Sequence, residues 1–326
     1  MPVRIRIAFL GALLSTILCP FGAAPPACAV IVLGGRDANG NLNSSGRNLN
    51  PAPSNLSSYV GTWGSYLATP IAPRYFITAN HIGDGGGGGT FIYSDGTSTP
   101  SIYTASLAAV QNDLAIWQIS TADPSFTHYA PLYTASTETG NALITIGRGT
   151  ARGGPVTSPT TMQQAGWFWG SGDGLTSWGA NTVLSVAPVS SPPAGFGGNF
   201  VRFAFNNNGN PDTGILSVGD SGGPTFVFNP TDNQYELAGI NALVDQVSSQ
   251  ADSSTNPQFL MQAALYDSRG FYTGPTQVQG SSPVPLNSYA SSIASAIPFV
   301  DSVIAPEPSV LALLGLSSAW LLVRRR

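Results

Sequence analysis

The sequence predicts an all-β protein, and three observations carry that prediction. Glycine and proline are abundant, at 38 and 26 residues, while charged residues make up only 9% of the chain against 42% hydrophobic residues. Short runs rich in Val, Ile, Thr, Phe and Tyr recur between turn-forming residues, which is typical of short strands joined by tight turns. Residues 30–304 contain no heptads, no fixed repeat and no long helical period. We therefore expect a β-sandwich or a pair of β-barrels.

The strand assignments follow from apolar runs that end in turn residues. Residues 83–90 read "GDGGGGGT", and because glycine loses more backbone entropy on ordering than any other residue, a mobile surface loop is expected there. The predicted strands are 64–68, 74–79, 90–94, 114–119, 142–147, 200–205, 225–229 and 235–240.

One short helix is predicted near the end of the chain. Asn287 or Ser288 can cap its first turn, and residues 289, 293 and 297 fall on one face. Pro298 ends or kinks this helix. Residues 299–305 then read as a linker.

The first 29 residues read as a secretory signal peptide that signal peptidase removes after Ala29. Arg4 and Arg6 precede an apolar stretch that runs to about residue 22. A lipoprotein signal at Cys28 is the alternative, although the preceding Pro-Pro-Ala lacks the usual leucine-type residue. Both cysteines of the chain lie in this segment, so the mature protein is expected to contain no disulfide.

Residues 306–326 form a second targeting segment. A Pro-Glu-Pro triplet is followed by an uncharged apolar stretch over 310–323 and by three arginines at 324–326. Fourteen helical residues reach about 21 Å, short of the ~30 Å hydrocarbon core of a membrane. This order resembles the PEP-CTERM sorting signal of Gram-negative bacteria. The resemblance implies transient anchoring in the inner membrane, processing by an exosortase-type enzyme and delivery to the envelope or extracellular matrix; a plain hydrophobic anchor is the alternative.

The charge between the two targeting segments is negative. Seven of the twelve arginines and fifteen of the sixteen acidic residues lie there, for a net charge near −8. This balance argues against nucleic acid and against anionic lipid as partners.

The motif "GDSGGP" at 219–224 makes Ser221 a candidate nucleophile. A serine hydroxyl needs a base, and a histidine base needs a carboxylate to fix its tautomer. "FITANH" at 76–81 and "NDLA" at 112–115 place His81 and Asp113 at the ends of predicted strands. The amides of Gly219 and Ser221 are candidate oxyanion donors. Taken singly, each motif can also be an ordinary turn or strand end.

Together, these motifs resemble the trypsin/chymotrypsin-like serine peptidases. "TANH", "NDLA" and "GDSGGP" follow in the family's order, with gaps of 32 and 108 residues, and the similarity covers most of 30–297. The resemblance implies a peptidase domain over 30–298 built of two six-stranded barrels with a short C-terminal helix. It also implies Ser221 as nucleophile, His81 as general base and then acid, Asp113 as its orienting partner, and Gly219 with Ser221 as oxyanion hole.

The sequence departs from that family at its specificity pocket. The position six residues before the serine is Ile215, so no carboxylate is expected to bind Lys or Arg there. If "LAGINALV" at 237–244 and "AALY" at 263–266 correspond to the family's pocket segments, the resemblance implies that Val244 and Ala264 replace glycines of the pocket wall and narrow the pocket. Small or medium apolar substrate side chains are therefore expected.

Two further segments carry hypotheses. "VIVLGG" at 30–35 resembles the terminus that pairs, in many relatives, with the aspartate before the serine, so Asp220 is a possible activation partner. "GWFWGSGDGLTSWG" at 166–179 holds three tryptophans, and it reads either as a loop pinned by buried aromatics or as an aromatic wall of the substrate cleft.

The sequence thus predicts an exported serine endopeptidase that acts on polypeptides. No cofactor or metal is expected, because the only histidines are His81 and His128, the latter read as a loop residue, and no cluster has ligand spacing. One alternative is a catalytically silent binding or matrix protein at the cell surface. An esterase with the same triad is another, disfavoured because the residues after Pro224 read as a strand and not a helix.

Overall fold

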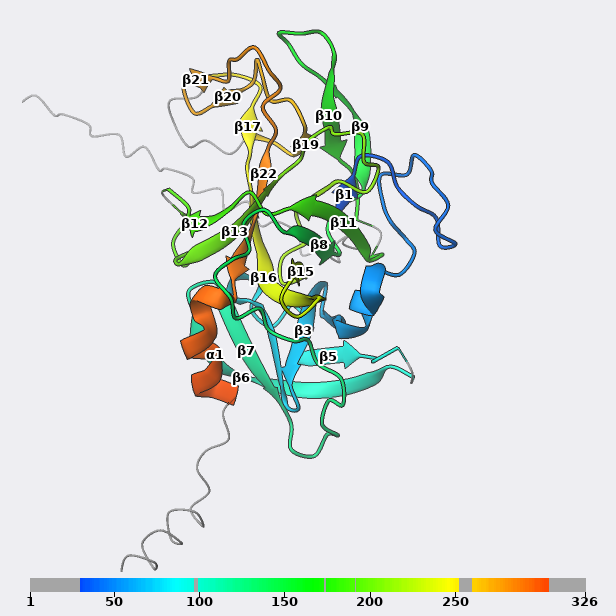
Figure 1. Cartoon of the computed structure of the whole chain (residues 1–326), viewed down its shortest axis with the longest axis vertical. Helices are drawn as coiled ribbons and strands as arrows, with labels where there is room; N and C mark the ends of the chain where they lie inside the picture. Colours follow the sequence, from blue (N-terminus) through cyan, green and yellow to red (C-terminus); the bar gives the residue numbers. More distant parts are fainter. Residues whose placement is uncertain (1–29, 97–98, 173, 191, 252–259, 305–326) are drawn as a thin grey trace, which may run out of the picture.

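The structure is a computed structural model that describes residues 30–304, apart from 97–98, 173, 191 and 252–259. The predicted signal peptide and sorting tail lie outside the described residues. The fold is all-β with one short C-terminal α-helix, as predicted. Figure 1 shows a barrel below a larger sheet, with the helix beside the barrel.

The N-terminal half is a closed six-stranded barrel in the order β2-β3-β4-β7-β6-β5. Because the barrel is closed, β2 and β5 at the two ends of this order pair with each other, and neither is left as an exposed edge. Aromatic side chains fill the interior; Phe76 and Phe91, for example, stack with ring centroids 4.3 Å apart. The strands are β2 (Gly61–Trp63), β3 (Tyr66–Ala72), β4 (Tyr75–Ala79), β5 (Thr90–Tyr93), β6 (Ser101–Gln111) and β7 (Leu114–Ile119).

The C-terminal half is built on a seven-stranded antiparallel sheet in the order β11-β8-β15-β16-β22-β13-β12. This sheet, with smaller sheets beside it, stands where the sequence predicts a second six-stranded barrel. Its strands are β8 (Ala142–Gly147), β11 (Ser177–Thr182), β12 (Ser185–Pro188), β13 (Asn199–Ala204), β15 (Pro224–Asn229), β16 (Gln234–Val244) and β22 (Asn287–Ser292).

Three smaller sheets complete this half. They have the orders β1-β14, β19-β10-β9 and β18-β17-β20-β21. The strands are β1 (Ile31–Val32), β14 (Gly214–Ile215), β9 (Arg152–Thr157), β10 (Gln164–Trp169), β19 (Ala263–Leu265), β17 (Val247–Ser248), β18 (Leu260–Met261), β20 (Tyr272–Thr273) and β21 (Thr276–Gln277).

One apolar core joins the two halves. Leu67 and Ile116 of the barrel belong to the same buried cluster as Ile144 and Phe226 of the large sheet. Short 3₁₀ helices lie over Pro53–Tyr59, Asn80–Ile82 and Ala294–Ala296. Because the core is continuous, the loops at the junction between the halves are held in fixed positions relative to one another.

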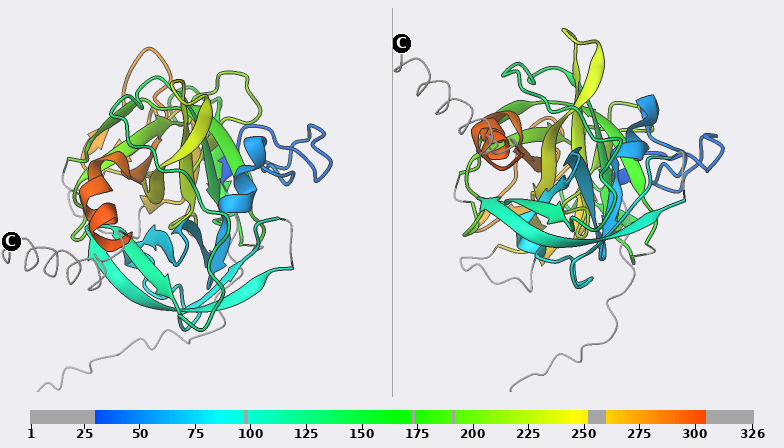
Figure 2. Two further views of the ribbon diagram at one scale, coloured as in Figure 1. Left: turned by 60° about the horizontal axis from the view of Figure 1, so that its bottom comes forward. Right: turned by 90° about the horizontal axis from the view of Figure 1, so that it is seen from below.

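The C-terminal helix differs from the prediction in its position. Residues 287–292, expected as its first turns, form β22, and helix α1 runs over Ile297–Ile304. Pro298 lies in the first turn of α1. Backbone N–H groups in that turn have no acceptor within the helix, so the N–H that proline lacks costs no hydrogen bond. Val300 is fully buried against the barrel, so 299–304 are part of the folded domain and not a linker. Figure 2 shows α1 lying beside the barrel in both views.

The glycine-rich loop lies largely at the surface, and part of it is bonded to the chain around Trp63. The N–H of Ser65 donates to the carbonyl of Gly85 at 3.1 Å, and the indole of Trp63 donates to the carbonyl of Gly83 at 3.0 Å. A Cβ on Gly64 would lie 2.1 Å from the Gly85 oxygen, so the two backbones meet only because side chains are missing. These contacts hold the segment that directly follows His81 against the chain around Trp63 and Ser65.

Candidate active site

His81, Asp113 and Ser221 come together at the junction of the two halves. His81 lies in the 3₁₀ helix that follows β4, and Asp113 lies in the turn between β6 and β7. Ser221 lies in the turn that precedes β15. His81 Nδ1 is 2.8 Å from Asp113 Oδ1 and 3.0 Å from Oδ2, and His81 Nε2 is 2.7 Å from Ser221 Oγ.

The Asp113 carboxylate bonds to both the backbone and the ring of His81. It is buried, with 2% of its side chain exposed, and it accepts the backbone N–H of His81 at 3.0 Å as well as the ring Nδ1–H. An ionised carboxylate can only accept, so Nδ1 carries the hydrogen and Nε2 is left to accept from the serine hydroxyl. The arrangement fixes the tautomer that a general base requires.

The turn that presents Ser221 depends on glycine. Gly222 has a φ of +79°, and a Cβ there would lie 2.3 Å from Thr78 Oγ1 and 2.6 Å from the carbonyl oxygen of Leu67. A hydrogen bond joins the turn to β16: the N–H of Gly222 donates to the carbonyl of Asn241 at 3.0 Å. The motif glycine therefore lets the nucleophile turn lie directly against the barrel.

The two predicted oxyanion donors are unengaged. Within the described part of the chain, the backbone N–H groups of Gly219 and Ser221 make no hydrogen bond. Gly219 adopts a φ of +94°, a conformation that residues other than glycine rarely adopt. Two free amides beside a serine hydroxyl can donate to a developing negative charge.

Asp220, the predicted activation partner, is fully buried and bonds to uncharged groups. Its carboxylate accepts from the N–H of Ser217 and of Gly149, each at 2.6 Å, and from the hydroxyl of Ser217 at 3.1 Å. Burial raises its pKa to about 7, and no cation pairs with it among the described residues. Val30 and Ile31 are also buried, with β1 paired to β14. Pairing of Asp220 with a mature terminus stays a prediction.

A cleft of about 340 Å³ opens beside Ser221 and His81. Of the three residues predicted for the specificity pocket, Val244 lines this cleft. Ile215 and Ala264 do not, because both are fully buried in a core cluster, where Ile215 pairs with Ile31 and Ala264 with Trp167. The apolar walls come from Leu216, Val218, Leu243 and Val244.

The tryptophan-rich stretch packs away from this cleft. Trp169 and Trp178 are buried, and Trp167 lies under the guanidinium of Arg152, 4.4 Å from ring centroid to Cζ. None of the three lines the cleft beside Ser221. Trp167 and Trp169 lie on β10 and Trp178 on β11, so the structure places the three tryptophans on strands, neither in a loop nor in the wall of this cleft.

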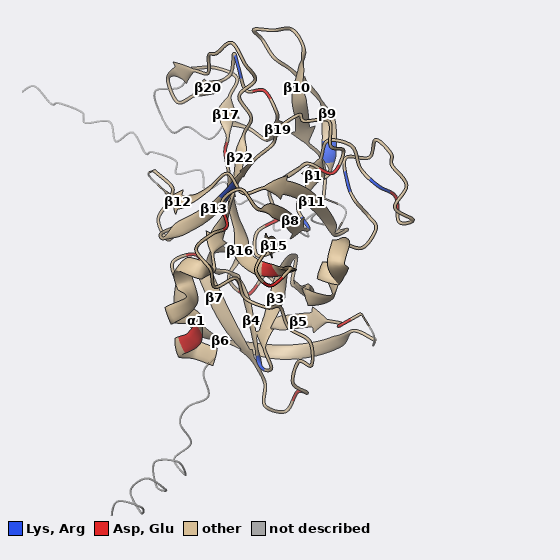
Figure 3. Ribbon diagram, viewed as in Figure 1, with Lys and Arg blue, Asp and Glu red and all other residues tan. Residues whose placement is uncertain are grey.

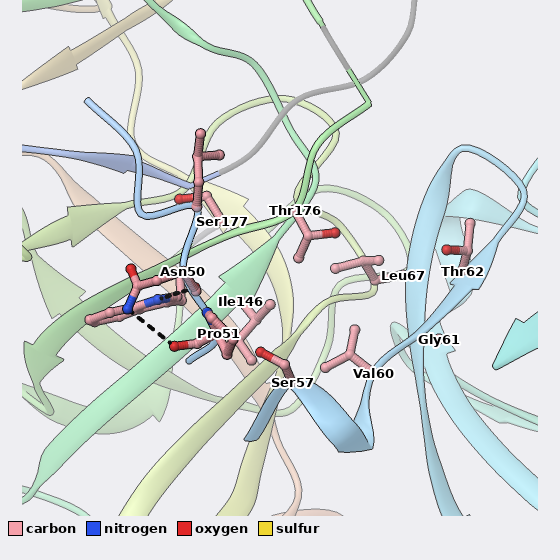
Figure 4. A pocket seen from close by; sticks show the side chains of 12 residues that line it. Asn50, Pro51, Ser57, Val60, Gly61, Thr62, Leu67, Ile146, Thr176 and Ser177 are labelled. Carbon is pink, nitrogen blue, oxygen red and sulfur yellow. Dashed lines mark hydrogen bonds between the residues drawn. The ribbon is translucent and has the colours of Figure 1, made fainter. Parts of the chain in front are cut away.

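A second cavity, of about 270 Å³, is lined by residues of β2, β3, β8 and β11 and of the chain around Asn50 (Figure 4). Leu67 and Ile146 line it, and their carbonyl oxygens face Gly222 and Gly223. Trp178 forms one wall and donates its indole N–H to the carbonyl of Asn50 at 3.0 Å. The residues that line this cavity carry no charge.

Phe196 was not anticipated from the sequence. Its ring centroid lies 5.0 Å from that of His81, although the two residues are far apart in the chain. The only local signal is a single aromatic residue among glycines, "GFGG" at 195–198. His128, expected outside the site, stacks on Tyr59 and bonds to Ser58 Oγ at 2.9 Å.

The described residues contain neither a candidate membrane span nor a metal-binding cluster. In residues 30–304, with the stated gaps, no helix has both the length and the apolar character needed to cross a membrane. In the same ranges, His, Cys, Asp and Glu side chains form no group of three or more that could hold a metal ion.

Comparison with known proteins identifies no family. No known family model matches the sequence, and no curated protein does. Among solved structures, the chain is similar to the inactive form of a serine-to-alanine mutant of Rv3671c from M. tuberculosis H37Rv. The TM-score is 0.39 at 11% identity, over 80% of this chain and 94% of that one. We draw no functional conclusion from a likeness at this TM-score.

Proposed function

We propose that the protein is a serine endopeptidase that hydrolyses peptide bonds through Ser221, His81 and Asp113. The observation that carries the proposal is the continuous hydrogen-bond chain from Asp113 through the imidazole to Ser221 Oγ. Two free amides and an open cleft lie beside the serine and support the same reaction.

In the proposed reaction, Ser221 Oγ attacks the carbonyl carbon of the substrate while His81 Nε2 takes its proton. Asp113 stabilises the imidazolium without taking the proton. The amides of Gly219 and Ser221 donate to the oxyanion of the tetrahedral intermediate. The carbon–nitrogen bond then breaks as the imidazolium protonates the leaving amine. Water, deprotonated by His81, releases the acyl group and restores the serine.

The cleft favours small or medium apolar side chains. Leu216, Val218 and Val244 supply its apolar walls. The only carboxylate beside it, Asp220, is occupied by two backbone amides and a hydroxyl. A substrate Lys or Arg would therefore lose its hydration without gaining an ionic partner.

We also propose that the enzyme acts outside the cytoplasm on polypeptide partners. The sequence of residues 1–29 supports removal by signal peptidase, and that of 306–326 supports processing by an exosortase-type enzyme. The charge distribution supports the exclusion of nucleic acid as a partner, because the arginines of the described residues lie at separate places along the ribbon (Figure 3) and at least five of these seven bond within the protein. The guanidinium groups of Arg36, Arg74, Arg148, Arg152 and Arg269 bond to carboxylates or carbonyl oxygens.

Turnover of casein and of short-chain esters by the exported protein, beside Ser221→Ala, tests the proposal. An endopeptidase cleaves casein into fragments and the variant does not. Ester turnover without casein cleavage would instead indicate an esterase. Binding of protein without either reaction would indicate a silent binding module, and both of these results contradict the proposed function.

A further inference from the structure

The ring of Phe196 packs against the imidazole of His81 and has no part in the reaction described above. The two ring centroids are 5.0 Å apart and the ring planes are inclined by 36°. Phe196 precedes β13 and belongs to the C-terminal half, whereas His81 and Asp113 belong to the barrel. The contact therefore bridges the junction across which Ser221 and His81 meet.

The segment that carries Phe196 is seated on the turn that carries Asp113. A Cβ on Gly197 would lie 2.6 Å from Asn112 Oδ1, and one on Gly198 would lie 3.2 Å from Asn112 Nδ2. Asn112 has a φ of +52° and directly precedes Asp113. One short segment thus contacts both the histidine and the turn of its carboxylate partner.

The same segment is fixed at its other end. Asn199 Nδ2 donates at 3.0 Å to Oγ of Ser295, which lies in the 3₁₀ helix over Ala294–Ala296, and β13 pairs with β22 directly afterwards. Phe196 is half-buried, and the His81 side chain is 29% exposed. An anchored aromatic ring beside a partly exposed imidazole limits both the ring's rotation and the approach of water.

We propose that Phe196 is a positioning residue for His81, holding the imidazole so that Nε2 faces Ser221 and shielding the hydrogen bond between Nδ1 and Asp113. The inference rests on the proposed function for its kinetic consequence. An aromatic ring also attracts a cation, so the contact strengthens when His81 becomes an imidazolium in the reaction. Phe196 acts through His81 and takes no proton itself.

The kinetic test compares Phe196→Ala with Phe196→Tyr in the exported protein. Loss of one aromatic contact is expected to lower kcat about three- to tenfold. KM should change less than twofold, because Phe196 is not among the residues that line the substrate cleft. Phe196→Tyr keeps the ring and should retain most of the activity. Phe168→Ala, which removes a ring that is 43% exposed on β10, is the matched control and should leave kcat unchanged.

A second readout does not need turnover. The Nδ1–H proton of His81, bonded to Asp113, is observed by proton NMR, and in Phe196→Ala its resonance should broaden through faster exchange with water. Asn112→Gly keeps the positive φ but removes the side chain against which Gly197 and Gly198 pack. It should therefore broaden the same resonance with Phe196 still present.

The inference is overturned if Phe196→Ala leaves kcat and the Nδ1–H resonance as in the wild type, or if Phe196→Tyr is as impaired as Phe196→Ala. Thermal unfolding of each variant excludes loss of fold as the cause of a lower kcat. A wild type without turnover contradicts the proposed function, and the NMR comparison then still decides whether Phe196 positions His81.

Discussion

Asp113 is the residue on which the orientation of His81 depends. It is nearly buried, and both the backbone N–H and the ring Nδ1–H of His81 donate to it. The local sequence predicts this residue because "NDLA" places a carboxylate at a strand end. Its catalytic role stays a prediction, but its hydrogen bonds give that role a direct test.

Asp113→Asn should lower kcat about 10³- to 10⁴-fold while leaving the fold intact. An amide nitrogen in place of one carboxylate oxygen donates and cannot accept the Nδ1–H, so the wrong tautomer is favoured and Nε2 no longer accepts from Ser221. Peptide hydrolysis and circular dichroism measure the two effects. A loss of less than tenfold in a folded variant would contradict the assigned role.

Asp220 makes stability depend on pH. Burial raises its pKa from 3.8 to about 7, so the folded state binds this proton more tightly than the unfolded state. The stabilising contribution is complete below pH 3.8 and is lost as the pH rises through about 7. The loss is on the order of 1.4 kcal/mol for each unit by which the pKa is raised.

Denaturant unfolding between pH 4 and 8 measures this loss of stability. The protein used carries an uncharged extension before Val30, which keeps a terminal ammonium group away from Asp220. Asp220→Asn, which cannot ionise, should remove this loss. If a mature terminus pairs with Asp220, the protein beginning at Val30 also lacks the loss, since an ammonium favours the ionised carboxylate. An extended protein whose stability is independent of pH in this range would refute the account.

At the scale of elements, the nucleophile turn is positioned by close backbone packing. Gly222 packs against Thr78 of β4 and against the Leu67 carbonyl of β3, which brings Ser221 to the histidine at the end of β4. The motif letters predict a turn at this point. They do not predict which strands it contacts, because those contacts join distant segments of the chain.

Gly222→Ala should destabilise the protein by at least about 2 kcal/mol more than Gly209→Ala. Both positions have a positive φ, near +80°, but a Cβ at Gly209 meets nothing within 4 Å. The control therefore measures backbone strain alone, and the difference measures the clash. Equal losses in urea unfolding would show that the turn can relax.

The strand predictions succeeded where apolar runs were long enough to show their pattern. All eight predicted runs coincide with strands, among them β7 and β8 at their full predicted lengths. β22 was mistaken for a helix because its small residues are buried on both faces between β13 and β16. Without alternation of polar and apolar residues, the spacing of Tyr289 and Ile293 favoured a helix.

The displaced helix leads to a stability prediction. Val300 of α1 is fully buried, whereas its neighbour Asp301 is exposed. Val300→Ala should lower the free energy of unfolding by about 1 to 3 kcal/mol, and Asp301→Ala should change it by less than about 0.5 kcal/mol. Similar effects of the two variants in urea unfolding would mean that the helix does not belong to the core.

At the scale of the whole molecule, the sequence predicted the barrel and the meeting of His81, Asp113 and Ser221, but not the form of the second half. Its large sheet has seven strands, and whether a sheet closes is decided by registers between distant strands. Ile215 and Ala264 were assigned to the cleft by alignment with a family, yet both lie in the core. The contact of Phe196 with His81 could not be predicted, because no local pattern encodes it.

The central claim is that Ser221 is an activated nucleophile, and covalent labelling tests it most directly. The purified protein is treated with a fluorophosphonate probe beside Ser221→Ala and His81→Ala, and the labelled residue is identified by mass spectrometry. The account predicts one adduct, on Ser221, that both substitutions abolish. A folded wild-type protein that stays unlabelled, or a label that persists without His81, would contradict it.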